Sequence, residues 1–150
     1  MRLYLDTSVL GAPLDREDQR RVNVTRSVLR AISAGDHIGV ISNVVQEELE
    51  QAPAGLQRGI LTEVGDIEFE LVLEGNESRA LFAAYEATQV LPARYRNDLR
   101  HVAVASASRV DAVVSWNFRH LVNLRTRRAV HAGNLRLGYP LVEIISPEEI

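Results

Sequence analysis

The stretch that decides how the rest of the chain is interpreted is Arg2-Leu3-Tyr4-Leu5-Asp6-Thr7-Ser8. A short, mainly apolar run ends here at a carboxylate, and two hydroxyl residues follow it. This order is typical of a strand whose carboxyl end faces a functional site. Asp6 could instead be an ordinary turn residue, but its place at the end of an apolar run favours a functional role.

Strands and helices alternate along the remaining sequence. The hydrophobic pattern and the turn residues predict helices at residues 15–34, 42–53, 54–62, 77–89 and 98–109 and a last helix ending near Gly133. They predict further strands at residues 37–41, 67–73, 111–115 and 140–145, with 67–73 at a half-exposed edge and a polar loop at 92–97. The expected fold class is α/β, a three-layer α/β/α domain over 1–150 with a mainly parallel central sheet of four to five strands.

Composition removes several classes of chemistry. The chain has no cysteine, which excludes disulfides, thiolate zinc sites and cysteine nucleophiles. It also has no lysine, so any mechanism that needs one is excluded. Haloacid-dehalogenase phosphatases, for example, need a lysine and a second acid at the position of Ser8. No signal segment and no apolar run of about 20 residues is present, so we expect a cytoplasmic protein without a membrane span.

The charge distribution bears on the choice of partner. A net charge of −3 argues at first sight against nucleic acid. However, residues 112–142 contain no acid, and five arginines fall there: Arg119, Arg125, Arg127, Arg128 and Arg136. On charge alone a solvated helix face is the favoured explanation, and a surface for RNA is the alternative.

Acidic residues follow or face the carboxyl ends of the predicted strands. Asp6 follows the first strand, Glu48 lies on the helix after the second, and Asp98 joins them if it begins its helix. Two carboxylates about 4 Å apart repel by ~1 kcal/mol in water and by more in a cleft. Mg²⁺ or Mn²⁺ removes this repulsion and prefers oxygen ligands. The alternatives are a solvated charge for Glu48 and a charge favoured by the helix dipole for Asp98.

Four stretches of the sequence resemble, in order, the motifs of PIN-domain nucleases. They are residues 3–10, 42–49, 98–103 and 114–121. In the second stretch, the family's acid lies six positions after the serine and is followed by a leucine. Counted from Ser42, this acid is Glu48 and not Glu47. The fourth has the form found in a VapC-like toxin branch of the family, and the resemblance extends over nearly the whole chain.

The resemblance implies a metal-dependent endoribonuclease that is the toxin of a toxin–antitoxin pair. The implied catalytic residues are Asp6, Glu48, Asp98 and Asn117, of which the three acids would hold Mg²⁺ or Mn²⁺. Thr7, Ser8 and Ser115 would support these ligands, and Arg119, Arg125, Arg127 and Arg128 would bind the RNA backbone. The implied partners are an RNA substrate, a cognate antitoxin and a second copy of the chain.

Two positions depart from the family pattern. Asn117 stands where many relatives have an aspartate, which puts a second metal ion in doubt. A PIN-like domain that binds RNA or a protein without cutting is therefore the alternative function. Arg100 stands where an apolar residue is expected, and the sequence offers no chemical account of it. Nearby, we expect His101 to pack against or hydrogen-bond to Asp98, and Asp111 to be structural.

Overall fold

A five-stranded, wholly parallel sheet forms the centre of the computed structural model, which describes residues 1–150. Its strands are β1 (Arg2–Leu5), β2 (Ile38–Ser42), β3 (Glu70–Val72), β4 (Ala112–Val114) and β5 (Glu143–Ile145). Their order is β3-β2-β1-β4-β5, and every pair is parallel. Since all strands run in one direction, their carboxyl ends share one edge, here called the carboxyl edge.

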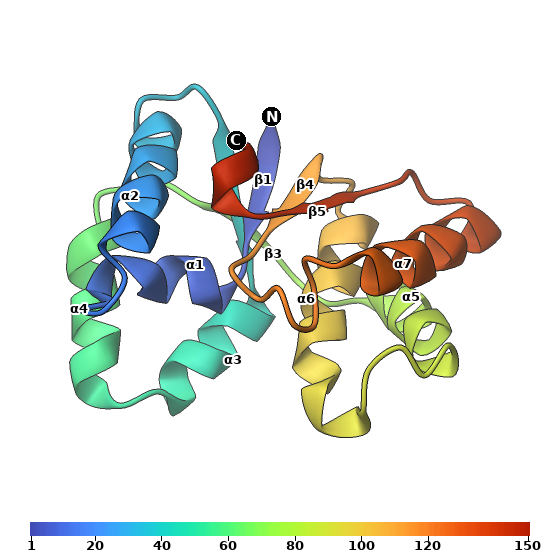
Figure 1. Ribbon diagram of the computed structural model, residues 1–150. Helices are drawn as coiled ribbons and strands as arrows, with labels where there is room; N and C mark the ends of the chain where they lie inside the picture. The colour runs from blue at the N-terminus through green and yellow to red at the C-terminus, as the bar shows by residue number, and fades with distance from the viewer.

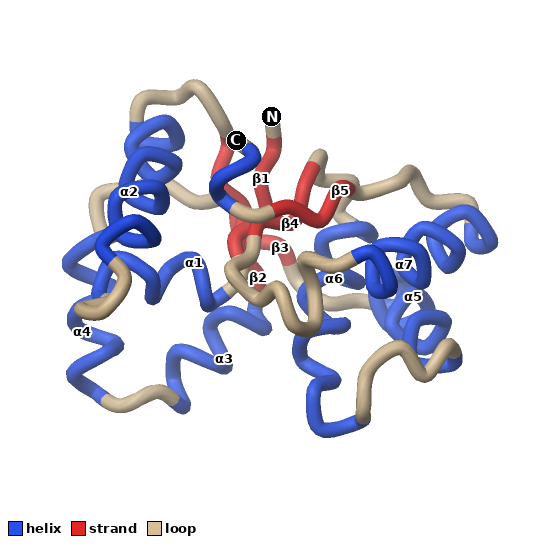
Figure 2. Tube along the Cα trace, viewed as in Figure 1, coloured by secondary structure: helices blue, strands red, loops and turns tan.

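Helices cover both faces of this sheet (Figures 1 and 2). On one side lie α1 (Thr7–Gly11), α2 (Gln19–Ser33), α3 (Asn43–Gln51) and α4 (Ala54–Val64). On the other lie α5 (Asn76–Ala87), α6 (Arg96–Ala107) and α7 (Leu124–Leu137). Short 3₁₀ turns occur at Ala12–Leu14, Ala93–Tyr95 and Pro147–Glu149. The expected three-layer α/β/α arrangement is confirmed.

The central strands are buried on both faces, as expected for a parallel sheet between two helical layers. Leu3, Tyr4 and Leu5 of β1 are fully inaccessible to solvent, and β4 is almost as deeply buried. On α6, Ala103 and Ala105 are small enough for the helix to approach the sheet closely. At the sheet edge, β3 is largely exposed, which confirms the edge strand predicted at 67–73.

Near the N-terminus, the segment after Asp6 is more helical than the sequence pattern indicated. The helix predicted at 15–34 begins only at Gln19, where the Asp18 side chain accepts a hydrogen bond from the backbone N–H of Arg21. The preceding residues 7–14 form α1 and a 3₁₀ turn instead of a loop. The predicted loop at 92–97 likewise contains a 3₁₀ turn and the start of α6.

The prediction that the last helix ends near Gly133 is wrong. The helix continues to Leu137 and ends at Gly138, whose φ of +78° suits the left-handed C-terminal cap. Gly133 is needed for packing: a Cβ atom there would lie 2.9 Å from the ring of Tyr85.

Both chain ends lie at the sheet edge opposite the carboxyl edge (Figure 1). The backbone carbonyl of Met1 accepts a hydrogen bond from Ile38, and Ile150 shares a cavity with His37. Asp111 is structural, as expected, because its Oδ2 accepts the backbone N–H of Arg2 at 2.6 Å. None of the helices combines the length and apolar character required to cross a bilayer.

Candidate active site

Asp6 lies at the carboxyl end of β1 and caps the N-terminus of α1. Its Oδ1 accepts the backbone N–H of Val9 at 3.2 Å and the Ser8 hydroxyl at 2.5 Å. Its Oδ2 accepts the Ser115 hydroxyl at 2.5 Å, and the residue is only 4% exposed. Both carboxylate oxygens are therefore fixed, one by donors from α1 and the other by a donor that follows β4.

The two serine hydroxyls are themselves oriented by backbone N–H groups. The Ser8 hydroxyl accepts the N–H of Trp116, and the Ser115 hydroxyl accepts the N–H of Asn117, each at 2.9 Å. Because these contacts use hydroxyl lone pairs, the hydroxyl protons remain available to point at Asp6. The predicted supporting residues Ser8 and Ser115 thus do contact Asp6.

Glu48 reaches the carboxyl edge from α3, which begins after Ser42. The Ser42 hydroxyl caps α3 by accepting the N–H of Val44, as the sequence predicts. Glu48 Oε1 accepts the Thr7 hydroxyl at 2.8 Å and is paired with His101 Nε2. Its other oxygen, Oε2, has no protein partner, and 30% of the side chain is exposed. Glu48 therefore offers one free oxygen.

His101 is buried behind Glu48. Its Nδ1 lies 2.7 Å from the Tyr4 hydroxyl, which in turn lies 2.6 Å from the Ser42 hydroxyl. Of the two expected contacts between His101 and Asp98, packing or a hydrogen bond, the hydrogen bond is absent. The reason is geometric: His101 points into the core from α6 toward Tyr4, whereas Asp98 lies in the first turn at the exposed end of the helix.

Asp98 is paired with a residue that sequence reasoning missed. Its Oδ2 lies 2.9 Å from Nδ1 of His120, whose ring stacks against Tyr95 at a centroid distance of 3.9 Å. The side-chain oxygen of Asn117 accepts the backbone N–H of His120 at 3.0 Å and so closes the turn that carries this histidine. The spacing of three residues between Asn117 and His120 is the sequence signal that could have indicated this turn.

The three acids differ in their electrostatic environment. Burial raises the pKa of Asp6. The charge of His101 and the hydroxyls of Ser115 and Ser8 lower it, but by less than burial raises it. Burial also raises the pKa of Asp98, and the charge of Asp6 adds to the increase. The hydrogen bond and charge of His120 lower this pKa, but by less. Burial acts on Glu48 as well, but His101 and Thr7 outweigh it and hold the pKa of Glu48 below its usual value.

These environments bear on whether the edge fits a divalent metal ion. No three His, Asp or Glu side chains lie close enough together to hold one ion. Mg²⁺, however, usually keeps several waters and takes only one or two carboxylates. Asp6 and Asp98 are close enough for the charge of one to raise the pKa of the other, a cost that a cation removes. The donors fit Mg²⁺ or Mn²⁺ bound by two carboxylates and water.

The four predicted RNA-binding arginines are not equivalent. The side chains of Arg119 and Arg128 are exposed and make no hydrogen bond or ion pair within the chain. Arg125 contacts the carbonyl of Gln89 at 3.4 Å. Arg127 donates to the carbonyl of Ile144 at 2.7 Å and thereby joins α7 to β5.

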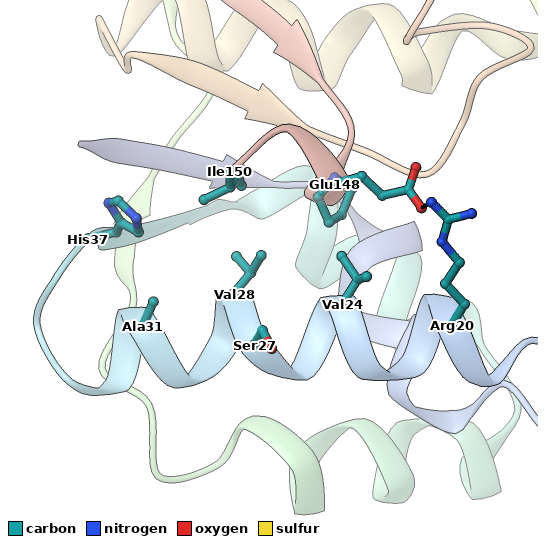
Figure 3. Close-up of a pocket in the computed structure, with 9 residues that line it drawn as sticks. Arg20, Val24, Ser27, Val28, Ala31, His37, Glu148 and Ile150 are labelled. Carbon is teal, nitrogen blue, oxygen red and sulfur yellow. Dashed lines mark ion pairs between the residues drawn. The ribbon is translucent and has the colours of Figure 1, made fainter.

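A surface cavity of about 440 Å³ lies elsewhere, between α2 and the C-terminal turn (Figure 3). It is lined mainly by α2, including Val24 and Val28, and an ion pair between Arg20 and Glu148, 2.9 Å long, lies at one end. None of the carboxylates at the carboxyl edge lines this cavity.

Comparisons with known proteins support the fold. No family model matches the sequence, and no curated protein matches it. A solved structure does match: a chain of VapBC2 from Rickettsia felis, crystallised bound to a DNA fragment from their promoter. The match has a TM-score of 0.59 and 11% sequence identity, and it covers 97% of this chain and 98% of that one. The chain therefore has the three-layer α/β/α PIN-like fold that its four motifs predict.

Proposed function

We propose that this chain is a metal-dependent endoribonuclease that hydrolyses RNA phosphodiester bonds. The observation that carries the proposal is the gathering of Asp6, Glu48 and Asp98 at the carboxyl edge, with Asp6 buried and oriented by two serine hydroxyls. A buried, oriented carboxylate whose pKa is raised by its surroundings is a frequent feature of functional sites.

In this proposal Asp6 and Asp98 hold Mg²⁺ or Mn²⁺, and Glu48 binds directly or through water. The ion, when bound, lowers the pKa of a water molecule and stabilises the charge that develops on the phosphoryl oxygens. Ser8 and Ser115 keep the Asp6 oxygens in place, as supporting residues of metal ligands generally do.

Glu48 is assigned to the attacking water. Its Oε2 is free to accept a proton, while Thr7 and His101 fix Oε1. Because these two residues keep the pKa of Glu48 low, the side chain is ionised at neutral pH, as an acceptor must be. Asn117 acts through the turn that it closes, which places His120 against Asp98.

RNA would reach the site along the surface after Asn117. Arg119 and Arg128 have exposed guanidinium groups that can pair with phosphates. Arg125 can contribute if it gives up its single long contact, and Arg127 contributes mainly by holding α7 to β5. Phe118, whose side chain is half-exposed beside Asn117, offers a ring on which a base can stack.

The chain's partners are proposed from the resemblance. We assign it the role of toxin, with a cognate antitoxin, a second copy of itself as dimer partner and a place in the cytoplasm. The similar Rickettsia felis structure is a VapBC2 complex on promoter DNA, which is consistent with a partner protein here.

The test is cleavage of a mixed RNA pool by purified protein with Mn²⁺ and with EDTA. Asp6→Asn is compared with Asp36→Asn, which removes an exposed acid whose side chain makes no hydrogen bond or ion pair. We expect cutting only with metal, no cutting by Asp6→Asn, and full activity in Asp36→Asn. Wild-type activity in a folded Asp6→Asn protein would contradict the assignment of Asp6 to the catalytic site.

A non-cutting, PIN-like domain that binds RNA or a protein is the second candidate. It is favoured by the neutral Asn117, whose oxygen is used in a turn, and by the absence of a three-ligand group. The same RNA pool separates the two: retention of RNA by the protein without metal-dependent cleavage over a broad range of sequences supports the second candidate.

A further inference from the structure

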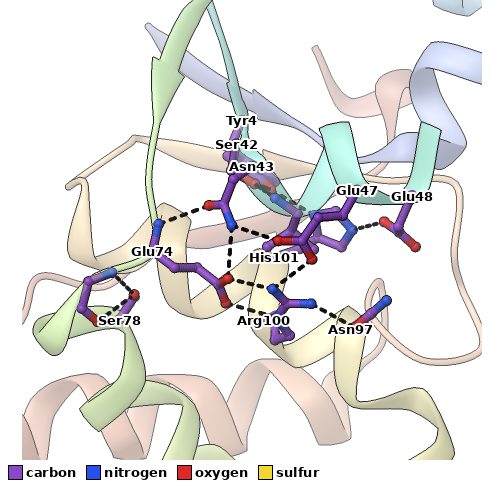
Figure 4. Close-up of polar contacts among 12 residues, drawn as sticks. Tyr4, Ser42, Asn43, Glu47, Glu48, Glu74, Ser78, Asn97, Arg100 and His101 are labelled. Carbon is purple, nitrogen blue, oxygen red and sulfur yellow. Dashed lines mark hydrogen bonds and ion pairs between the residues drawn. The ribbon is translucent and has the colours of Figure 1, made fainter. Parts of the chain in front are cut away.

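Arg100 is deeply involved in the structure, although the sequence offers no account of it. Its side chain is 22% exposed and joins three segments at the carboxyl edge (Figure 4). Nε donates to Glu74 Oε1 at 2.8 Å, and Nη2 donates to Glu74 Oε2 at 2.5 Å. Nη2 also donates to Glu47 Oε2 at 3.0 Å, and Nη1 donates to Asn97 at 3.2 Å.

Asn43 completes this cluster from the first turn of α3. Its Nδ2 donates to Glu47 Oε1 and to Glu74 Oε2, each at 3.0 Å. Its Oδ1 accepts the backbone N–H of Glu74 at 2.9 Å. Together, Asn43, Glu47, Glu74 and Arg100 form a closed network, here called the arginine clasp, that ties α3 and α6 to the segment after β3 (Figure 4).

The position of the clasp in the chain connects it to the site. Glu47 precedes Glu48, and Arg100 lies between Asp98 and His101. The contact between Glu48 and His101 therefore bridges the same two helices, α3 and α6, that the clasp holds together. A small change in the distance between these helices alters that contact directly.

We propose that Arg100 is a positioning residue, which fixes α3 against α6 so that Glu48 and Asp98 face the same site. This inference rests on the proposed nuclease function for its catalytic consequence. Without the guanidinium, Glu47 and Glu74 would be like charges bridged only by the Asn43 amide, and their repulsion would loosen the contact between the segments. Lysine cannot replace it fully, because only arginine presents a planar fork to a carboxylate.

The chain contains a matched control. Arg26 pairs with Glu63 through the same fork, with Nε to Oε2 at 3.2 Å and Nη2 to Oε1 at 2.6 Å. That pair joins α2 to α4, and none of the site residues contacts it. Arg26→Met therefore removes a similar ion pair without touching the α3–α6 contact, and Arg100→Met removes the arginine from the clasp.

Four quantities are measured on wild type, Arg100→Met, Arg100→Lys and Arg26→Met: Tm, Mn²⁺ affinity, the kcat and KM of RNA cleavage, and the ¹⁵N resonances of the His101 ring. We expect both methionine variants to lower Tm. Only Arg100→Met should weaken Mn²⁺ binding and lower kcat, each by about tenfold or more, as loss of a supporting residue does. KM should stay constant, because the proposed RNA contacts lie elsewhere, and Arg100→Lys should recover part of the loss.

The His101 resonances test the positioning role of Arg100 independently of the proposed nuclease function. They should shift in Arg100→Met and not in Arg26→Met, whether or not the protein cuts RNA. If the wild type neither binds Mn²⁺ nor cuts, the proposed function fails and the resonances alone decide about the clasp. Equal effects of the two methionine variants on His101, kcat and Mn²⁺ affinity would overturn the inference. Should Arg100→Met not fold, Glu74→Gln replaces it with the same expected direction, because the amide keeps one accepting oxygen of the two and removes the charge.

Discussion

Two polar clusters lie along α6, a fully buried one that is neutral and a partly exposed one that is charged. At the C-terminal end of α6, the Tyr85 hydroxyl donates to the side-chain oxygen of Asn134, and its oxygen lies 3.1 Å from the Ser106 hydroxyl. Asn134 Nδ2 donates to Ser106 and to the carbonyl of Pro140. All these groups are neutral, since burial raises the pKa of Tyr85 to about 12. At the N-terminal end, the cluster consists of carboxylates and histidines.

The difference is the one expected between a structural cluster and the proposed catalytic one. The neutral cluster satisfies its own donors and acceptors and joins α5, α6 and α7. The acidic cluster leaves Asp6 and Asp98 with raised pKa values, so the metal-free fold bears a cost in keeping them ionised. Carboxylates with perturbed pKa values are frequent at functional sites, which supports the proposed role of this cluster.

The largest expected contrast is in activity. Asp98→Asn should lower the rate of RNA cleavage by at least about 100-fold, because it removes one of the two charges proposed to hold the metal. Tyr85→Phe, in the neutral cluster, should leave the rate unchanged. Initial rates at saturating Mn²⁺ test both, and a near-normal rate in Asp98→Asn would remove this residue from the metal site.

Metal binding should stabilise the protein through the acidic cluster alone. At Mn²⁺ concentrations of about 100 times Kd, the free energy of unfolding should rise by about 2.7 kcal/mol, which raises Tm by roughly 5–10 °C. Thermal unfolding with and without Mn²⁺ should show this increase in wild type and Tyr85→Phe and not in Asp6→Asn. An equal increase in Asp6→Asn would mean that the ion binds elsewhere.

Breaking the neutral cluster should change stability instead of activity. Tyr85→Phe leaves the buried side chains of Ser106 and Asn134 without the tyrosine hydroxyl, which should cost about 1–3 kcal/mol. Urea unfolding measures this loss. A cleavage rate that fell together with stability would show that the two clusters are coupled through α6.

The smallest expected contrast between the two clusters is in how the free energy of unfolding depends on pH. The folded-state pKa of Asp6 is raised, so its favourable contribution is present below the unfolded pKa and is lost as pH rises through the folded pKa. In EDTA, Asp6→Asn should therefore gain stability relative to wild type as the pH rises above about 4, the pKa of an unfolded aspartate. The corresponding difference for Tyr85→Phe should stay flat around neutral pH, because Tyr85 does not titrate there. A flat difference for Asp6→Asn would contradict the raised pKa.

The sequence predicted the parts of the fold that depend on local pattern. Buried strands and the Ser42 cap follow from apolar runs and a hydroxyl at the right position, so β1, β2 and α3 are found where expected. The end of α7 was mistaken because Gly133 has a packing role against Tyr85 that no local pattern reveals.

The site was predictable to a lesser extent. The motifs indicated that Asp6, Glu48 and Asp98 share the carboxyl edge, because parallel strands end together. They did not indicate which histidine meets which acid. Those pairings depend on the direction in which α6 presents Asp98 and His101 and on the turn that carries His120. The role of Arg100 was hidden for the same reason, since Glu47 and Glu74 are distant in sequence.

The location of the chain ends has a practical consequence for handling the molecule. Met1 is 58% exposed and Ile150 is 38% exposed, and both lie at the sheet edge away from the acids. A linker attached at either end therefore leaves the molecule on the far side of the sheet. The protein can be immobilised on a sensor surface or held in an optical trap with its acidic edge turned toward the solution, where a long polymer can approach without meeting the tether.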